Sequence, residues 1–395
     1  MIVIHNVNVY TITQGKITSG AVAVADGKIV AVGESGGDVT QLAPSVAEAL
    51  KSGQAELVDG EGGVLTPGII DAHTHLGIHE EGVGVEGADY NEAVNPITPD
   101  MRAIDGIYPD DAGIKDALRA GVTAACVLPG SANVLGGTAV VVRTWGDRVD
   151  KMVIKDQVGM KAAFGENPKR VYRAKDKSPI TRMATAALLR EWLHKARHYD
   201  EKKRKAQEKG DVTDFDPKLE ALLPVVRGEL PLRAHAHRAD DIATAVRIAE
   251  EFGLKIVIEH CTEGHLIADY LAEKGIPAIV GPTLSSRSKV ELRARTFATP
   301  RILAEAGVCV ALMTDHPVIP LEHLPVAAAL AWKAGMPEEQ VLAALTINPA
   351  RILGIADRFG SIEPGKEADL VLWSDHPLDV RSAPKKIWLA GRQVI

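Results

Sequence analysis

The stretch Pro67–Gly77, which reads PGIIDAHTHLG, places two histidines at alternate positions shortly after an apolar run. Side chains at alternate positions of a β-strand point to the same face, about 6–7 Å apart along the backbone. His73 and His75 can therefore converge on one point where such a strand ends. By itself a His-x-His pair is only moderately specific for a metal site, so the interpretation depends on the rest of the chain.

Short apolar runs alternate with helical stretches after this strand, up to about residue 345. Typical pairs are PLRAHAH followed by ADDIATAVRIAEEFG, and LKIVIEH followed by GHLIADYLAEKG. Helical stretches that end in glycine before the next strand are typical of a parallel α/β fold. The runs within residues 67–345 predict a (β/α)8 barrel of the TIM type.

The two ends of the chain have a different pattern from the middle. Residues 1–66 contain short strands and turns, such as GAVAVADGKIVAVG with a hairpin signal at Asp26-Gly27. The far end is similar, with GSIEPGKEADLVLWS and KKIWLAGRQVI. We therefore expect strand-rich segments on both sides of the barrel.

Composition limits the classes of function. The net charge of −7 without a dominant basic patch argues against partners such as nucleic acid or an anionic membrane. No apolar run reaches the roughly 18 residues of a membrane-spanning helix, and the start MIVIHNVNVYTI does not resemble a secretory signal. Three widely spaced cysteines favour reduced thiols in a cytoplasmic protein. The polar segment His194 to Lys218 mixes both signs of charge and predicts a solvated helix and loop.

Further metal-type residues follow other predicted strands. Each of them alone is more often structural, but parallel barrels build their sites at the carboxyl ends of the strands. Together they predict one metal site, for which imidazole nitrogens and a carboxylate suit zinc or a similar divalent ion. These residues are His235 and His237 after PLRA, His260 at the end of LKIVIE, and Asp315 after VCVALMT.

Several motifs together resemble the amidohydrolase superfamily, in its imidazolonepropionase-like branch. They are PGIIDAHTHLG, the later HAH, IEH and TDHP, and the closing NPARILGIADRFGSIEPGKEADLVLWS. The resemblance covers essentially the whole chain. It implies that residues 1–66 and 346–395 form one small β-sandwich domain beside the (β/α)8 barrel of residues 67–345. It also implies four metal ligands, His73, His75, His235 and His260, with Asp315 as both ligand and base.

Two roles stay open at this point. Binuclear members of the superfamily carry a bridging carboxylated lysine or glutamate, and GMKAAFGENPKR offers both Lys161 and Glu166. The GENP motif favours Glu166, with Lys161 as the alternative, and either could instead be an ordinary structural residue. His237 shares the face of His235, so it either acts on the substrate or packs behind the site.

We expect a hydrolase of a carbon–nitrogen bond, an amide or cyclic amide in a small molecule, that uses water activated by one or two zinc ions. Asp315 would carry the proton, and His237 would stabilise the oxyanion. A deaminase is disfavoured because Arg238 occupies the position where deaminases tend to carry glutamate, whereas a small-dipeptide peptidase stays open. A non-catalytic scaffold is disfavoured because the ligands are all present. Superfamily habit also suggests a homo-oligomer.

Overall fold

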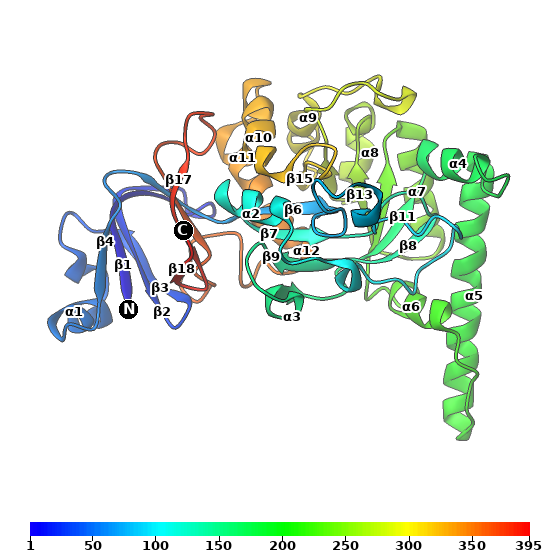
Figure 1. Cartoon of the computed structure of the whole chain (residues 1–395), viewed down its shortest axis with the longest axis horizontal. Coiled ribbons are helices and arrows are strands. Elements are labelled where there is room, and N and C mark those ends of the chain that lie inside the picture. The colour runs from blue at the N-terminus through cyan, green and yellow to red at the C-terminus, as the bar shows by residue number, and fades with distance from the viewer.

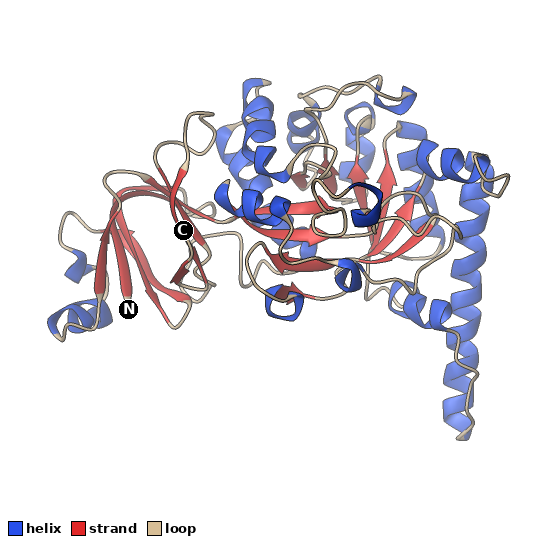
Figure 2. Ribbon diagram, viewed as in Figure 1, coloured by secondary structure: helices blue, strands red, loops and turns tan.

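The computed structural model describes residues 1–395, and it has a strand-rich body at one end and a larger α/β body at the other (Figure 1). Both termini lie in the strand-rich body. Helices surround the strands of the larger body, and one long helix extends beyond it (Figure 2). None of the helices combines the length and apolarity that crossing a membrane requires.

The strand-rich body is one eight-stranded sheet to which both ends of the chain contribute. Its path runs β18-β17-β16-β5-β1-β2-β3, and β4 pairs with β1. The junction is the antiparallel pairing of β5 with β16, where Leu370 faces Pro67. The strands are β1 (Ile2–Tyr10), β2 (Lys16–Ala25), β3 (Lys28–Glu34), β4 (Glu56–Asp59), β5 (Val64–Pro67), β16 (Leu370–Trp373), β17 (Pro384–Leu389) and β18 (Arg392–Gln393).

The α/β body contains two sheets. The first has the order β10-β9-β7-β6, with β6 (Ile69–Thr74), β7 (Val122–Val127), β9 (Val140–Arg143) and β10 (Val153–Lys155). The second has the order β15-β14-β13-β12-β11-β8, with β8 (Leu135–Thr138), β11 (Met160–Ala163), β12 (Leu232–Ala236), β13 (Ile256–His260), β14 (Ala278–Val280) and β15 (Val310–Leu312). Strands β11 to β15 are parallel and follow chain order, as the sequence predicts.

The two sheets meet where β6 lies beside the end of β15. The backbone N–H of His75 donates to the carbonyl oxygen of His316 at 3.1 Å. The hydroxyl of Thr314 donates to Oδ2 of Asp71, also at 3.1 Å. The strand pairing therefore gives an α/β body of two joined sheets, in which the first and last parallel strands are linked by these hydrogen bonds instead of a continuous ladder.

Twelve α-helices accompany the strands. The predicted helix after PLRAHAH is α7, and the polar segment forms the end of α5 and the loop after it, as expected. They are α1 (Pro44–Lys51), α2 (Ala112–Arg119), α3 (Val149–Met152), α4 (Glu166–Arg173), α5 (Arg182–Lys209), α6 (Pro217–Val226), α7 (Ala239–Glu251), α8 (Ala268–Glu273), α9 (Thr299–Glu305), α10 (Leu324–Lys333), α11 (Glu338–Leu345) and α12 (Ile347–Leu353).

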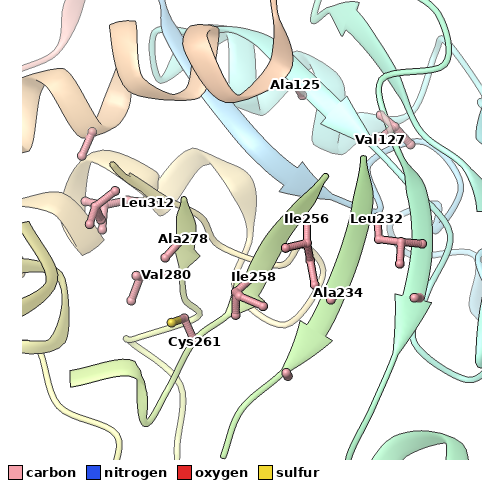
Figure 3. Packing of buried hydrophobic residues seen from close by; sticks show 14 of the residues in the cluster. Ala125, Val127, Leu232, Ala234, Ile256, Ile258, Cys261, Ala278, Val280 and Leu312 are labelled. Atoms are coloured by element: carbon pink, nitrogen blue, oxygen red, sulfur yellow. The ribbon is translucent and has the colours of Figure 1, made fainter. Parts of the chain in front are cut away.

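Alternate residues of the parallel strands face two different environments. Leu232, Ala234, Ile256 and Ile258 belong to the large apolar core, part of which is drawn in Figure 3. The intervening positions include Arg233, His235 and Glu259, which are all buried. Because the pleat has a period of two residues, one face of these strands packs the large apolar core, and the other carries these polar side chains together with apolar ones such as Val257 and Ile279.

Candidate metal centre and active site

The first histidine pair meets the last strand of the α/β body. His73 is the last residue of β6 on its face of the strand, and His75 is the first residue after the strand. Asp315 lies three residues after β15, where its Oδ1 is 3.1 Å from His73 Nε2 and 3.4 Å from His75 Nε2. The three side chains form one group of potential metal ligands.

A second group consists of His235, His237 and His260, from β12 and β13. The rings of His235 and His260 have centroids 4.2 Å apart, and the rings of His235 and His237 are 4.8 Å apart. This group adjoins the first, since the His73 and His260 centroids are 5.0 Å apart. Strand ends that are far apart in the sequence thus bring all five histidines and Asp315 to one place.

The hydrogen bonding of these side chains fits a bound metal. Both ring nitrogens of His235 and Nε2 of His260 are buried and have no hydrogen-bond partner. Buried polar atoms are almost always paired, so atoms left without a partner point to a ligand that completes them. Burial lowers the pKa of His75, His235 and His260, which keeps these imidazoles neutral with a free lone pair.

Lys161 and Glu166 occupy very different positions. Lys161 lies on β11, is fully buried, and its Nζ has no hydrogen-bond partner. Burial lowers the pKa of its amine to about 8, although Glu259 and Asp315 act in the opposite direction. Glu166 begins α4 and is partly exposed; its backbone N–H donates to Glu291 Oε2 at 3.0 Å. The structure therefore brings Lys161 to the two histidine groups, and it leaves the side chain of Glu166 outside the cavity lining.

His237 has polar neighbours on both sides of its ring. Its Nδ1 lies 2.8 Å from the hydroxyl oxygen of Thr262. Its Nε2 lies 3.3 Å from Nζ of Lys289 and 3.6 Å from Oε1 of Glu291. The Lys289–Glu291 pair, at 2.6 Å, belongs to the segment between β14 and α9 and was not foreseen from the sequence. No motif marks it, because its position depends on how that segment folds over the strand ends.

A cavity of about 460 Å³ opens onto these groups. His75, His235, His237 and Asp315 line its base, and Tyr90 and Asn91 contribute from the loop after β6. Other side walls come from α4 and from the segment after β14, which supply Arg170 and Lys289. This volume suits a small-molecule substrate.

Asp71, which precedes the histidine pair, connects β6 to the segment after β15. Its Oδ1 accepts from the backbone N–H of His73 at 2.8 Å, while its Oδ2 accepts from Thr314 beyond β15. Burial raises the pKa of its carboxyl to about 7, against the opposing effect of these hydrogen bonds. Asp71 therefore fixes the strand that carries His73 to the strand that leads to Asp315.

Known proteins resemble this chain over most of its length. The model of the amidohydrolase family matches residues 64–394. Amidohydrolase tasK of Hapsidospora irregularis is 32% identical over 362 residues, which cover 85% of this chain and 37% of that protein. The chain thus spans little more than a third of the length of tasK. An imidazolonepropionase of Geobacillus kaustophilus is 27% identical over 417 residues, which cover 91% of this chain and 85% of that protein.

A solved structure is more similar still. The crystal structure of an amidohydrolase from Thermotoga maritima superposes over all of both chains with a TM-score of 0.94 and 47% identity. The chain belongs to the amidohydrolase family, a family of metal-dependent enzymes, in its imidazolonepropionase-like branch. This membership makes it a hydrolase of the class that acts on carbon–nitrogen bonds.

Proposed function

We propose that this enzyme hydrolyses an amide or cyclic amide bond in a small molecule, with zinc held by His73, His75, His235, His260 and Asp315. The convergence of these side chains in two adjoining groups, from which His75, His235 and Asp315 line one cavity, is the observation that carries the proposal. A divalent ion held there supplies Lewis acidity, which polarises a carbonyl group and makes water acidic near neutral pH. Lys161 is the better-placed bridging group, and Glu166 is the second candidate.

Asp315 is the proposed proton carrier. Its side chain lies at the cavity base, so either carboxylate oxygen can accept a proton from the attacking water. The same oxygen can then donate this proton to the nitrogen that leaves. His73 and His75 hold the pKa of Asp315 low even though burial raises it, which keeps the carboxylate ready to accept.

His237 is the proposed oxyanion-stabilising residue. The hydroxyl of Thr262 can donate to Nδ1 of His237, which leaves the proton of the ring on Nε2. His237 lines the cavity, so this nitrogen is proposed to donate to the carbonyl oxygen as negative charge develops on it. The ammonium of Lys289 lies 3.3 Å from this nitrogen and is also a donor, so it must direct its protons at Oε1 of Glu291, 2.6 Å away, when Nε2 carries the ring proton.

The cavity walls favour a substrate with a negatively charged group. Arg170 lines the cavity and has no acidic partner within salt-bridge distance, whereas Lys289 is neutralised by Glu291 at 2.6 Å. Asn167 and Arg170 lie three residues apart on α4 and so share the face that lines the cavity. A carboxylate on the substrate would satisfy the free guanidinium.

The architecture that we propose for the enzyme goes beyond the strand pairs described above. We propose that the two sheets of residues 67–345 close into a (β/α)8 barrel, supported by the hydrogen bonds between β6 and the end of β15. Residues 1–66 and 346–395 would form the second domain, a β-sandwich, although α12 packs against β6 and β15. We also propose that the enzyme is a homo-oligomer. A location in the cytoplasm is part of the proposal too, in keeping with the three unpaired cysteines.

The test of the function is the Asp315→Asn variant, assayed with zinc-loaded protein against cyclic amides, acyl-amino acids and dipeptides. We expect kcat to fall by about 10²–10⁴-fold, the usual contribution of a general acid–base, while the metal content is retained. Asp379→Asn, at an exposed ion pair with Arg381, is the matched control and should retain full activity. Full activity of Asp315→Asn would refute the proposed base.

A further inference from the structure

A fully buried ion pair lies behind His73, away from the cavity. Arg233 on β12 and Glu259 on β13 both have side chains with no exposed surface. Neither side chain lines the cavity, so neither can touch a substrate there. The pair therefore has no part in the mechanism proposed above, and its burial calls for a physical reason.

The contacts of this pair lead directly to a proposed metal ligand. Oε2 of Glu259 lies 2.5 Å from Nδ1 of His73, and Oε1 accepts from Nε of Arg233. The guanidinium also donates to the carbonyl oxygen of Ala72 at 2.6 Å, next to His73 in β6. A third contact, at 3.5 Å, reaches Sγ of Cys126 on β7. Four strands, β6, β7, β12 and β13, are thus tied together behind one imidazole.

The chemistry of the contact defines the state of the ring. An ionised carboxylate can only accept hydrogen bonds, so Nδ1 of His73 must carry the proton. Arg233 donates to the other oxygen of Glu259, and a guanidinium with no exposed surface pairs with a carboxylate in its ionised form. In a neutral imidazole the other nitrogen, Nε2, is then a lone-pair donor, and it lies 3.1 Å from Asp315 Oδ1 among the potential ligands.

We propose that Glu259 and Arg233 are positioning residues, which hold His73 with its proton on Nδ1 and its Nε2 lone pair directed at the metal position. The inference rests on the proposed function, because it takes His73 as a metal ligand. A carboxylate behind a metal-bound histidine orients the ring and raises its basicity. Arg233 in turn orients the carboxylate with its planar guanidinium.

The local backbone shows that this arrangement is built at a cost. Regular alternation would place Glu259 and His260 on opposite faces of β13. His260 instead has a φ of 70° and Cys261 a φ of 50°, in the left-handed region, and both Glu259 and His260 reach His73. A buried ion pair also costs desolvation energy that an apolar pair of the same size would avoid. Both costs are understandable if the pair serves the metal ligand.

The first experiment measures zinc affinity by competition with a chelator, together with the visible spectrum of the cobalt-substituted protein. Glu259→Gln should bind zinc about 10–100-fold more weakly and show an altered cobalt spectrum. Arg233→Met should lower the affinity as well, and Arg233→Lys should recover part of it because it keeps the charge. Asp369→Asn is the matched control: it also removes the charge of a buried carboxylate paired with an arginine, Arg143, but this carboxylate contacts none of the proposed metal ligands. It should lower thermal stability and leave the zinc affinity unchanged.

A second measurement does not depend on the folding of a variant. Nitrogen-15 NMR of selectively labelled histidine in the zinc-loaded, unaltered protein should show His73 protonated on Nδ1. A proton on Nε2 would overturn this inference and leave the proposed function standing. Zinc affinity in Glu259→Gln within about twofold of the unaltered protein would have the same consequence. If the unaltered protein binds no zinc, the proposed metal centre is refuted, and the inference falls with it.

Discussion

Lys161 illustrates at the scale of one residue how burial indicates a role. A fully buried lysine with no partner for its Nζ carries a large desolvation cost when it is charged. This cost lowers the pKa of the Lys161 amine to about 8. At such a pKa a substantial fraction of the amine is neutral near physiological pH and available to react with carbon dioxide. Carboxylation would convert an unpaired cation into an anionic bridging ligand beside the histidine groups.

Substitution of Lys161 should therefore change the metal content. Lys161→Met is expected to bind fewer zinc equivalents per chain, or to bind them much more weakly, because it removes the bridging group. Glu166→Gln should keep the metal content of the unaltered protein, since its side chain lies outside the cavity lining. Elemental analysis after dialysis measures both variants, and the reverse pattern would identify Glu166 as the bridging residue.

Arg170 allows a test of the substrate class. With a substrate that carries a carboxylate, Arg170→Met should raise KM by about tenfold, in line with the 1.5–3 kcal/mol of a hydrogen bond to a charged group at a partly solvated site. The same variant should behave like the unaltered enzyme on the matching substrate in which the carboxylate is amidated. Arg170→Lys, which keeps the charge, should have an intermediate KM. Equal effects on both substrates would contradict the proposal that the natural substrate carries a negatively charged group.

At the scale of the secondary-structure element, strand periodicity predicted much of the site. The rule of alternation correctly groups His235 with His237 and His73 with His75 at the ends of β12 and β6. It could not have placed both Glu259 and His260 beside His73, because this requires the left-handed backbone at His260, which breaks the alternation at the end of β13. Such a departure depends on tertiary contacts, and no local pattern marks it.

The end of β14 offers a test of an element that orients a proposed ligand. The carbonyl oxygen of Gly281 lies 3.1 Å from Nδ1 of His260, and a Cβ at this glycine would overlap the carbonyl oxygen of Met313. Gly281→Ala should therefore cost about 1–3 kcal/mol of stability through overpacking and should also weaken zinc binding. Chemical denaturation and chelator competition measure the two effects.

Gly275→Ala is the matched control for this substitution. Gly275 also has a positive φ, of 62°, but a Cβ there would meet no atom within 4 Å. Only the backbone strain of about 1–2 kcal/mol should appear, with the zinc affinity unchanged. A larger loss of stability in Gly275→Ala than in Gly281→Ala would contradict the role of the close approach to Met313.

At the scale of the whole molecule, the sequence predicted the α/β body and the order of its parallel strands, because each strand and helix has its own periodicity. The meeting of both chain ends in one sheet came from the family resemblance, since antiparallel pairing between β5 and β16 leaves no signal in either segment. The same limit applies to the link between the bodies, where Arg143 on β9 pairs with Asp369 at 2.9 Å across more than two hundred residues.

Removal of the metal should reveal how the two bodies depend on each other. Ligands of the proposed centre come from β6, β12, β13 and the segment after β15, so a bound ion connects both sheets of the α/β body. An ion that binds only the folded state stabilises it by about 4 kcal/mol when its free concentration is a thousand times Kd. We expect a chelator to lower the midpoint of thermal unfolding, and zinc to restore it.

Magnesium should not restore the midpoint, because hard cations prefer oxygen to imidazole nitrogen. The eight-stranded sheet contains none of the proposed ligands. If the two bodies unfold separately, only the transition of the α/β body should therefore shift, whereas a single shifted transition would mean that contacts such as Arg143–Asp369 couple them. Calorimetry with and without chelator distinguishes these outcomes, and identical traces in both conditions would show that no ion holds the two sheets together.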